Sequence, residues 1–215
     1  MIKNFKLGIR LIKYGFGIKS NMFFAGLFLA IGICFYLFIP VNGVWMIYLM
    51  ASASYLVQIL SSLHVTAIAN SSPRRKTLYT KIPVLTSLPI YLLLYGAGCL
   101  VEFWMLHIGR RQEQEVAQSM IIAGLVMVWF MIYIGGAFKY FVASVVMAFV
   151  LIMFLIFGGN ILFAILDPHI SIGVALLIGL AAVLLGAILQ YLLTLLLYRH
   201  PASKAAQMRQ LQKYM

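Results

Sequence analysis

Very few side chains in this chain are suited to acid–base, metal or phosphoryl chemistry. Its 215 residues include four carboxylates, at Glu102, Glu113, Glu115 and Asp167, and four histidines. The sequence has no His-Glu-x-x-His motif, no Gly-x-Ser-x-Gly motif and no Gly-Lys dipeptide, so it lacks the signatures of a zinc protease, a serine hydrolase and a P-loop ATPase. We therefore expect no catalytic residue, no metal site and no cofactor in this chain. A site built on His64 is the remaining enzymatic alternative.

Basic side chains are abundant, and one group of them lies in segment 70–83. Its cations are Arg74, Arg75, Lys76 and Lys81. Ser72 followed by Pro73 predicts the first residues of a short helix. Cations in the first turn of a helix are disfavoured by the helix dipole, so we expect acidic lipid or an acidic partner to compensate. A plain orientation signal is the alternative interpretation.

The second basic group lies near the N-terminus. A helical wheel places Lys3, Lys6, Arg10 and Lys13 in one stripe. An apolar stripe of Ile2, Phe5, Ile9, Ile12 and Phe16 runs beside it. This pattern predicts that residues 1–20 contain an amphipathic helix lying in the cytoplasmic interface of a membrane. The alternative is a basic flank that only orients the first span.

The overall composition is that of an integral membrane protein. Hydrophobic residues make up 64% of the chain and charged residues 9%, and the mean hydropathy is +1.04. Long continuous apolar runs satisfy their backbone hydrogen bonds in lipid as helices, so we expect an all-α fold. The net charge of +12 lies beside apolar segments, which favours membrane lipid and a cytoplasmic partner over nucleic acid.

Six apolar segments are long enough to span a bilayer. They are residues 22–39, 44–68, 84–107, 117–137, 141–166 and 172–198. Arg110 and Arg111 fall on one side of this topology, with all four acids, and the other fourteen Lys and Arg fall on the opposite side. The positive side is cytoplasmic, so both termini are expected inside the cell. The predicted parts are the N-terminal helix in 1–20, a transmembrane domain in 21–200 and a basic tail in 201–215.

Polar residues within the spans are few. Ser54, Gln58, Ser61 and Ser62 lie on one face of the second predicted span, and Gln190 lies in the last. Intramembrane polar groups are costly in lipid, so we expect them to face the bundle interior or a subunit interface. Helix packing and a substrate pathway both remain open.

Three further residues carry expectations about the third span. Glu102 should lie near the outer interface and reach water. Pro83 and Pro89 should kink or restart the helix.

Taken together, the amphipathic N-terminus, the six spans and the basic segment resemble the permease subunit of an ABC-2-type ABC exporter, of the short kind found in low-GC Gram-positive bacteria. Segment 71–83 is similar to the coupling segment of such permeases, through Ser72, Pro73, Arg74, Arg75, Lys76, Leu78, Tyr79 and Lys81. Extended relatives carry a large insertion between spans five and six, whereas this chain has only about residues 166–171 there.

The resemblance implies specific partners. A second permease subunit, identical or homologous, would complete a translocation path, and separate ATPase subunits would bind ATP and Mg. Among the residues of segment 71–83, Arg74, Arg75, Lys76, Leu78 and Tyr79 would touch the ATPase.

Two other classes remain as alternatives. One is the substrate-capture subunit of an energy-coupling-factor vitamin importer, although the outer loops 40–43, 108–116 and 167–171 leave little material for a lid. The other is a membrane scaffold or assembly factor that transports nothing.

Overall fold

The computed structural model describes residues 2–11, 18–38, 44–61, 71–136, 139, 140, 143, 146, 147, 149, 150, 153 and 170–199. Regular structure in these residues is entirely α-helical. The helices are α1 (Ile2–Leu11), α2 (Ile18–Phe38), α3 (Val44–Ser61), α5 (Arg75–His107), α6 (Glu113–Gly136) and α8 (Ile172–Leu197). The expected all-α class is confirmed for the described part of the chain.

Four of these helices, α2, α5, α6 and α8, are long and apolar enough to cross a membrane. They overlap the predicted spans 22–39, 84–107, 117–137 and 172–198. The second predicted span coincides with α3, a shorter apolar helix that is described only to Ser61. Most of the predicted span 141–166 lies outside the described residues. The chain therefore has the helices of a multi-pass membrane protein, and the total of six spans stays a prediction.

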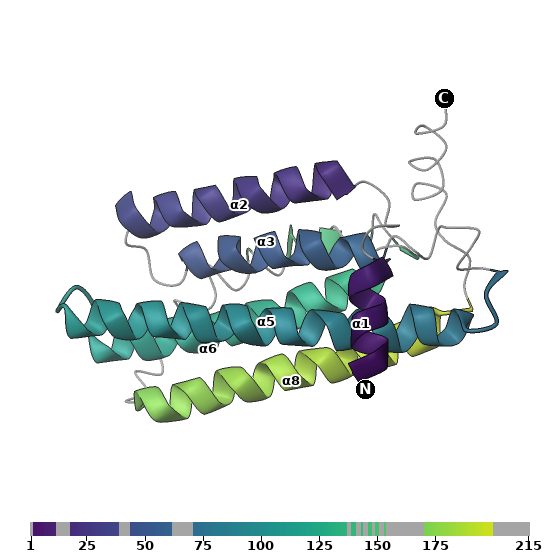
Figure 1. Cartoon of the computed structure of the whole chain (residues 1–215). Coiled ribbons are helices and arrows are strands. Elements are labelled where there is room, and N and C mark those ends of the chain that lie inside the picture. The colour runs from purple at the N-terminus through teal and green to yellow at the C-terminus, as the bar shows by residue number, and fades with distance from the viewer. Residues whose placement is uncertain are drawn as a thin grey trace.

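The long helices lie side by side, whereas α1 runs across them (Figure 1). The most extensive contacts are between α6 and α8 and between α2 and α3. Small residues allow the first pair to approach closely. A Cβ atom added at Gly124 would lie 2.7 Å from the Gly179 Cα, and one added at Gly179 would overlap the Tyr95 hydroxyl. Close backbone contact of this kind drives helix association in lipid, where hydrophobic burial gives little gain.

The outward faces of α2 and α8 are apolar. Phe23 is 67% exposed, Leu177 is 64% exposed and Leu196 is 73% exposed. Exposed apolar side chains on this scale are solvated by lipid tails in a membrane protein. The core lies between α3, α5, α6 and α8, with Met50, Tyr91 and Met127 among its buried side chains.

Charged residues separate to the two ends of this bundle. The described carboxylates lie at one end, hereafter the acidic end: Glu102 near the end of α5, and Glu113 and Glu115 at the start of α6. The opposite end, hereafter the basic end, holds the start of α5, the end of α8 and helix α1 (Figure 1). The segregation expected from sequence is thus present in the fold, with Arg110 and Arg111 alongside the acids.

Local signals explain the turn at the acidic end. Gly109 has a φ of 72°, a left-handed conformation that favours glycine. The Glu115 carboxylate accepts a hydrogen bond of 3.1 Å from the Gln112 backbone N–H, which is one half of a capping box. Glu113 and Glu115 also lie in the first turn of α6, where the helix dipole favours negative charge.

Segment 70–83 differs from the prediction of a separate short helix. Helix α5 begins at Arg75 with Arg74 at its N-cap position, which makes no side-chain cap. Ser72 instead stabilises the preceding turn: its hydroxyl oxygen accepts a 3.2 Å hydrogen bond from the Arg74 N–H, and its carbonyl accepts one of 3.0 Å from the Arg75 N–H. The expected cap at Ser72 with Pro73 as first helical residue is therefore wrong.

Of the kink or restart expected at Pro83 and Pro89, the restart is wrong, because α5 runs through both residues. Each proline removes one backbone hydrogen bond. Hydroxyl groups in the same turns donate to backbone carbonyls: Thr86 to Ile82 at 2.8 Å and Ser87 to Val84 at 3.2 Å. These bonds add contacts within the helix beside the prolines, and the carbonyls that lose a backbone donor are those of Tyr79 and Leu85. The basic segment and the third span are therefore one helix.

Candidate functional site

The start of α5 extends beyond the membrane thickness. Its 33 residues correspond to about 50 Å at 1.5 Å per residue. The hydrocarbon core of a bilayer is about 30 Å thick, so α5 is roughly 20 Å longer than a perpendicular crossing requires. Arg75, Lys76 and Lys81 lie in the first two turns of α5, so we expect the excess length at the basic end.

The cations at the start of α5 contact the rings of two tyrosines, Tyr79 and Tyr198. The Arg75 guanidinium lies 5.5 Å from the centroid of the Tyr79 ring, and the Lys139 amino group lies 6.0 Å from the same ring. Lys76 lies 5.7 Å from the ring of Tyr198, which follows α8. Cation–π attraction thus links α5, the residues after α6 and the end of α8.

Burial differs among these groups. Tyr79 is fully buried and Lys139 is 6% exposed, whereas Lys76 is exposed. Burial lowers the pKa of Lys139, and the positive charge of Arg75 lowers it further. The direct partner contact that the resemblance implies for Tyr79 does not fit its burial. Arg74 and Lys76 are exposed and Arg75 and Leu78 are half-buried, so these four side chains remain accessible to a partner.

Helix α1 packs on α5 at the same end. Gly8 is buried there, since a Cβ atom at this position would overlap the Thr86 hydroxyl and lie 3.2 Å from Ile82. Lys6 and Arg10 are exposed on α1. The side chain of Lys3 and the whole of Lys13 lie outside the described residues, so the predicted four-cation stripe is seen only in part.

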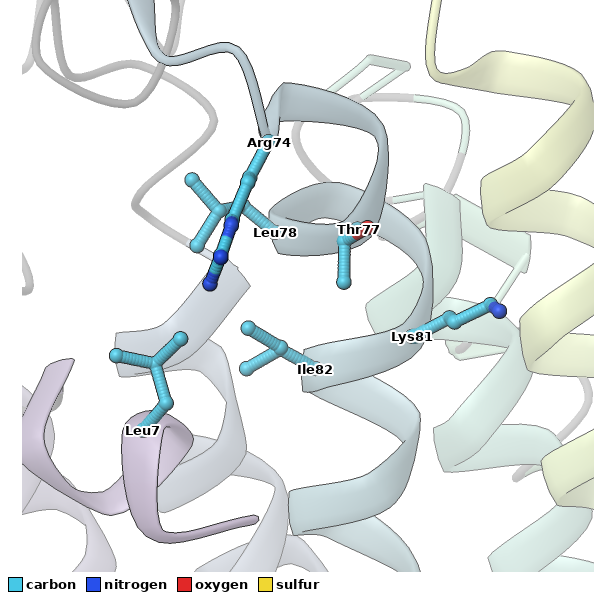
Figure 2. A pocket seen from close by; sticks show the side chains of 6 residues that line it. All are labelled: Leu7, Arg74, Thr77, Leu78, Lys81 and Ile82. Carbon is cyan, nitrogen blue, oxygen red and sulfur yellow. The ribbon is translucent and has the colours of Figure 1, made fainter. Parts of the chain in front are cut away.

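A cavity of about 290 Å³ lies between α1 and α5. Its lining residues are Leu7, Arg74, Thr77, Leu78, Lys81 and Ile82. Figure 2 shows Arg74 extending from the start of α5 toward Leu7, while the amino group of Lys81 points away from Leu7. The cavity therefore combines an aliphatic wall with cationic side chains at its rim.

The polar residues of the spans make separate contacts. Gln190 is fully buried and its Oε1 accepts a 3.0 Å hydrogen bond from the Ser87 hydroxyl. Gln58 donates to the Tyr133 hydroxyl at 3.1 Å, and Ser54 donates to the Ala51 carbonyl at 2.6 Å. Ser54 and Gln190 face the bundle interior, as expected. The side chain of Ser61 and all of Ser62 lie outside the described residues.

These contacts do not bring the polar side chains into one group. Ser54 bonds to its own helix, Gln58 to α6 and Gln190 to α5. Gln58 and Gln190 thus connect neighbouring helices, whereas the bond of Ser54 lies within α3, and a pathway along these residues stays a prediction.

Glu102 contradicts the expectation that it reaches water, because only 1% of its surface is exposed. Its Oε1 atom accepts hydrogen bonds from the Trp45 indole N–H at 2.9 Å and from the Ser119 hydroxyl at 2.6 Å. The Oε2 atom is buried and has no hydrogen-bond partner in the described part of the chain. Helical spacing gave a signal for this burial, since Glu102 shares a face with the buried Tyr95 and Cys99.

The chemistry available in the described residues is electrostatic. They contain no group of three His, Cys, Asp or Glu side chains that could hold a metal ion. The basic end attracts anions, because all the described carboxylates lie at the acidic end. Comparison of the chain with protein-family models, curated proteins and solved structures found no match.

Proposed function

We propose that this chain is the transmembrane permease subunit of an ATP-driven exporter of the ABC-2 type. In this proposal it lies in the plasma membrane with both termini in the cytoplasm, and the basic end faces the cytoplasm. A second permease subunit, identical or homologous, completes the translocation path. Separate ATPase chains bind ATP and Mg, and this chain carries no catalytic site of its own.

The observation that carries the proposal is the projecting start of α5. Arg75 and Lys76 lie on a helix that continues without a break into a membrane span. A cytoplasmic partner that binds these cations would act directly on the span, which is the arrangement required of a coupling element. An acidic surface on the ATPase would supply the complementary charge that the described basic end lacks.

Helix α1 gives further support. It lies across α5 rather than along the bundle (Figure 1), which is the orientation of a helix in the plane of the membrane. Its exposed Lys6 and Arg10 suit contact with anionic headgroups.

Charge reversal at the projecting end tests the proposal. The chain should co-purify with an ATPase. The double variant Arg75→Glu with Lys76→Glu should lower substrate-stimulated ATP hydrolysis by more than about tenfold, because its new negative charges would face the acidic surface of the ATPase. Arg110→Glu at the acidic end is the matched control and should leave hydrolysis unchanged. A double variant that still assembles and hydrolyses ATP at the normal rate would refute the coupling role.

The buried Glu102 favours a second candidate, a subunit that captures substrate for an energy-coupling-factor vitamin importer. A carboxylate with one unpartnered oxygen near the acidic end is a polar group that a ligand could engage. This candidate predicts tight binding of a small vitamin by the purified chain alone, measured by calorimetry. The exporter predicts no such binding, and a membrane scaffold would show neither vitamin binding nor coupled ATP hydrolysis.

A further inference from the structure

The cavity between α1 and α5 lies at the level of lipid headgroups. Thr86, which contacts Gly8, is 21 residues before His107, a distance of about 31 Å along the helix. That length matches the hydrocarbon core, so the crossing of α1 and α5 falls at its boundary. The cavity begins one turn further out, at Ile82. It therefore occupies the interfacial layer, where phospholipid phosphates are found.

The lining of the cavity has an apolar part and a cationic part, which match the acyl chains and the anionic headgroup of a lipid. Leu7, Leu78 and Ile82 form an aliphatic wall. Arg74 reaches back from the start of α5 toward Leu7, which brings its guanidinium from the cytoplasmic side toward that wall (Figure 2). The Lys81 side chain is exposed at the rim, and its long stem allows the amino group to turn toward an anion.

Size and charge narrow the class of ligand. A volume of about 290 Å³ is at the lower limit for small-molecule pockets, which suits a headgroup better than a drug-sized molecule. Arginine binds phosphate oxygens in a bidentate manner, and no carboxylate lines the cavity.

We propose that this cavity binds the phosphate headgroup of an anionic phospholipid, with Arg74 as its principal ligand and Lys81 as a second cation. The acyl chains extend along the aliphatic wall toward the hydrocarbon core. The bound lipid stabilises the contact between α1 and α5. The lipid site shares Arg74 with the surface available to an ATPase, but lipid binding itself requires neither the ATPase nor transport.

Lipid retention measures the proposed site directly. The full chain is reconstituted in bilayers of phosphatidylglycerol and phosphatidylcholine, extracted in mild detergent and examined by native mass spectrometry. The unmodified chain should retain phosphatidylglycerol selectively. Each cation near a membrane surface contributes about 1 kcal/mol, so Arg74→Gln with Lys81→Gln should weaken retention about thirtyfold. Lys19→Gln, which removes an exposed cation on α2 that does not line the cavity, removes only general attraction and should change retention less than Arg74→Gln alone.

A variant that fills the cavity separates a specific site from general attraction. Thr77→Leu adds volume without changing charge and should also reduce retention. The proposal would be overturned if Lys19→Gln and Arg74→Gln reduced the retention of phosphatidylglycerol equally. It would also be overturned if neither the cavity-filling variant nor the charge variants changed that retention. Retention of phosphatidylcholine as strong as that of phosphatidylglycerol would do the same.

Inorganic phosphate distinguishes a lipid site from a site for the free anion. If the lipid is the ligand, added phosphate should yield no phosphate-bound chain and phosphatidylglycerol should stay bound. Phosphate adducts that disappear in the Arg74→Gln variant, together with displacement of the lipid, would identify free phosphate as the ligand instead.

Discussion

The two ends of the bundle hold their charges in opposite ways. At the acidic end, Glu102 is buried and accepts hydrogen bonds from two other helices through Trp45 and Ser119. At the basic end, Arg74 and Lys76 are exposed, and Arg75 and Lys76 contact the rings of Tyr79 and Tyr198. Internal pairing makes the first charge a structural group. The exposed cations of the basic end remain accessible to an external anion. We therefore expect the basic end to carry function and the acidic end to contribute to the stability of the fold.

The largest predicted effect is at Glu102. Glu102→Ala removes the acceptor of the buried Trp45 N–H and one acceptor of the Ser119 hydroxyl, and it creates a void, so the free energy of unfolding should fall by about 3 kcal/mol. Unfolding in mixed detergent micelles measures this change. Glu113→Ala, an exposed carboxylate at the same end, should cost less than about 0.5 kcal/mol. Similar losses for both variants would contradict the distinction between the ends.

A smaller effect is expected at Lys139, the buried cation of the basic end. Its pKa is below the ordinary value of 10.5, so the folded state binds fewer protons than the unfolded state just below that pH. Stability should therefore increase as the pH rises toward 10.5, and Lys139→Met should remove the increase. At neutral pH the variant should be more stable than the parent. Unfolding measured between pH 8 and 10.5 tests whether the free energy of unfolding increases with pH. If it increases equally in Lys139→Met, the pH dependence belongs to another group.

The smallest effect on stability is expected at the start of α5, where Lys76 is exposed and Arg75 is half-buried. Arg75→Gln with Lys76→Gln should change the free energy of unfolding by about 1–2 kcal/mol, because each substitution removes a cation–π contact with a tyrosine ring. The same double variant should weaken binding of an acidic partner. A loss of stability as large as that of Glu102→Ala would show that the basic end is also a structural centre.

Local sequence patterns were sufficient to predict the helical class, the positions of four long helices and the division of charge between the ends. These features depend on the composition of continuous segments, which is visible in the sequence itself. The amphipathic pattern of Lys6 and Arg10 likewise marked α1.

Features that depend on distant contacts were not predicted. Trp45 and Glu102 are 57 residues apart in the chain, so no local pattern indicated that one buries the other. Tyr79 is fully buried although it lies in a segment rich in cations. Its burial depends on distant residues such as Lys139 and on the rest of the bundle, which no local pattern indicates. Pro83 and Pro89 were expected to kink or restart the helix, and α5 continues through both while it packs against α1, α3 and α8.

The course of α5 through its two prolines has a mechanical consequence. Pro83 and Pro89 leave the carbonyls of Tyr79 and Leu85 without their usual backbone donors, so the bending stiffness of the helix is lowest between these turns. Gly8 of α1 contacts α5 within this stretch, at Ile82 and Thr86. The contact with α1 therefore falls on the least stiff part of α5, where it supports the helix against bending.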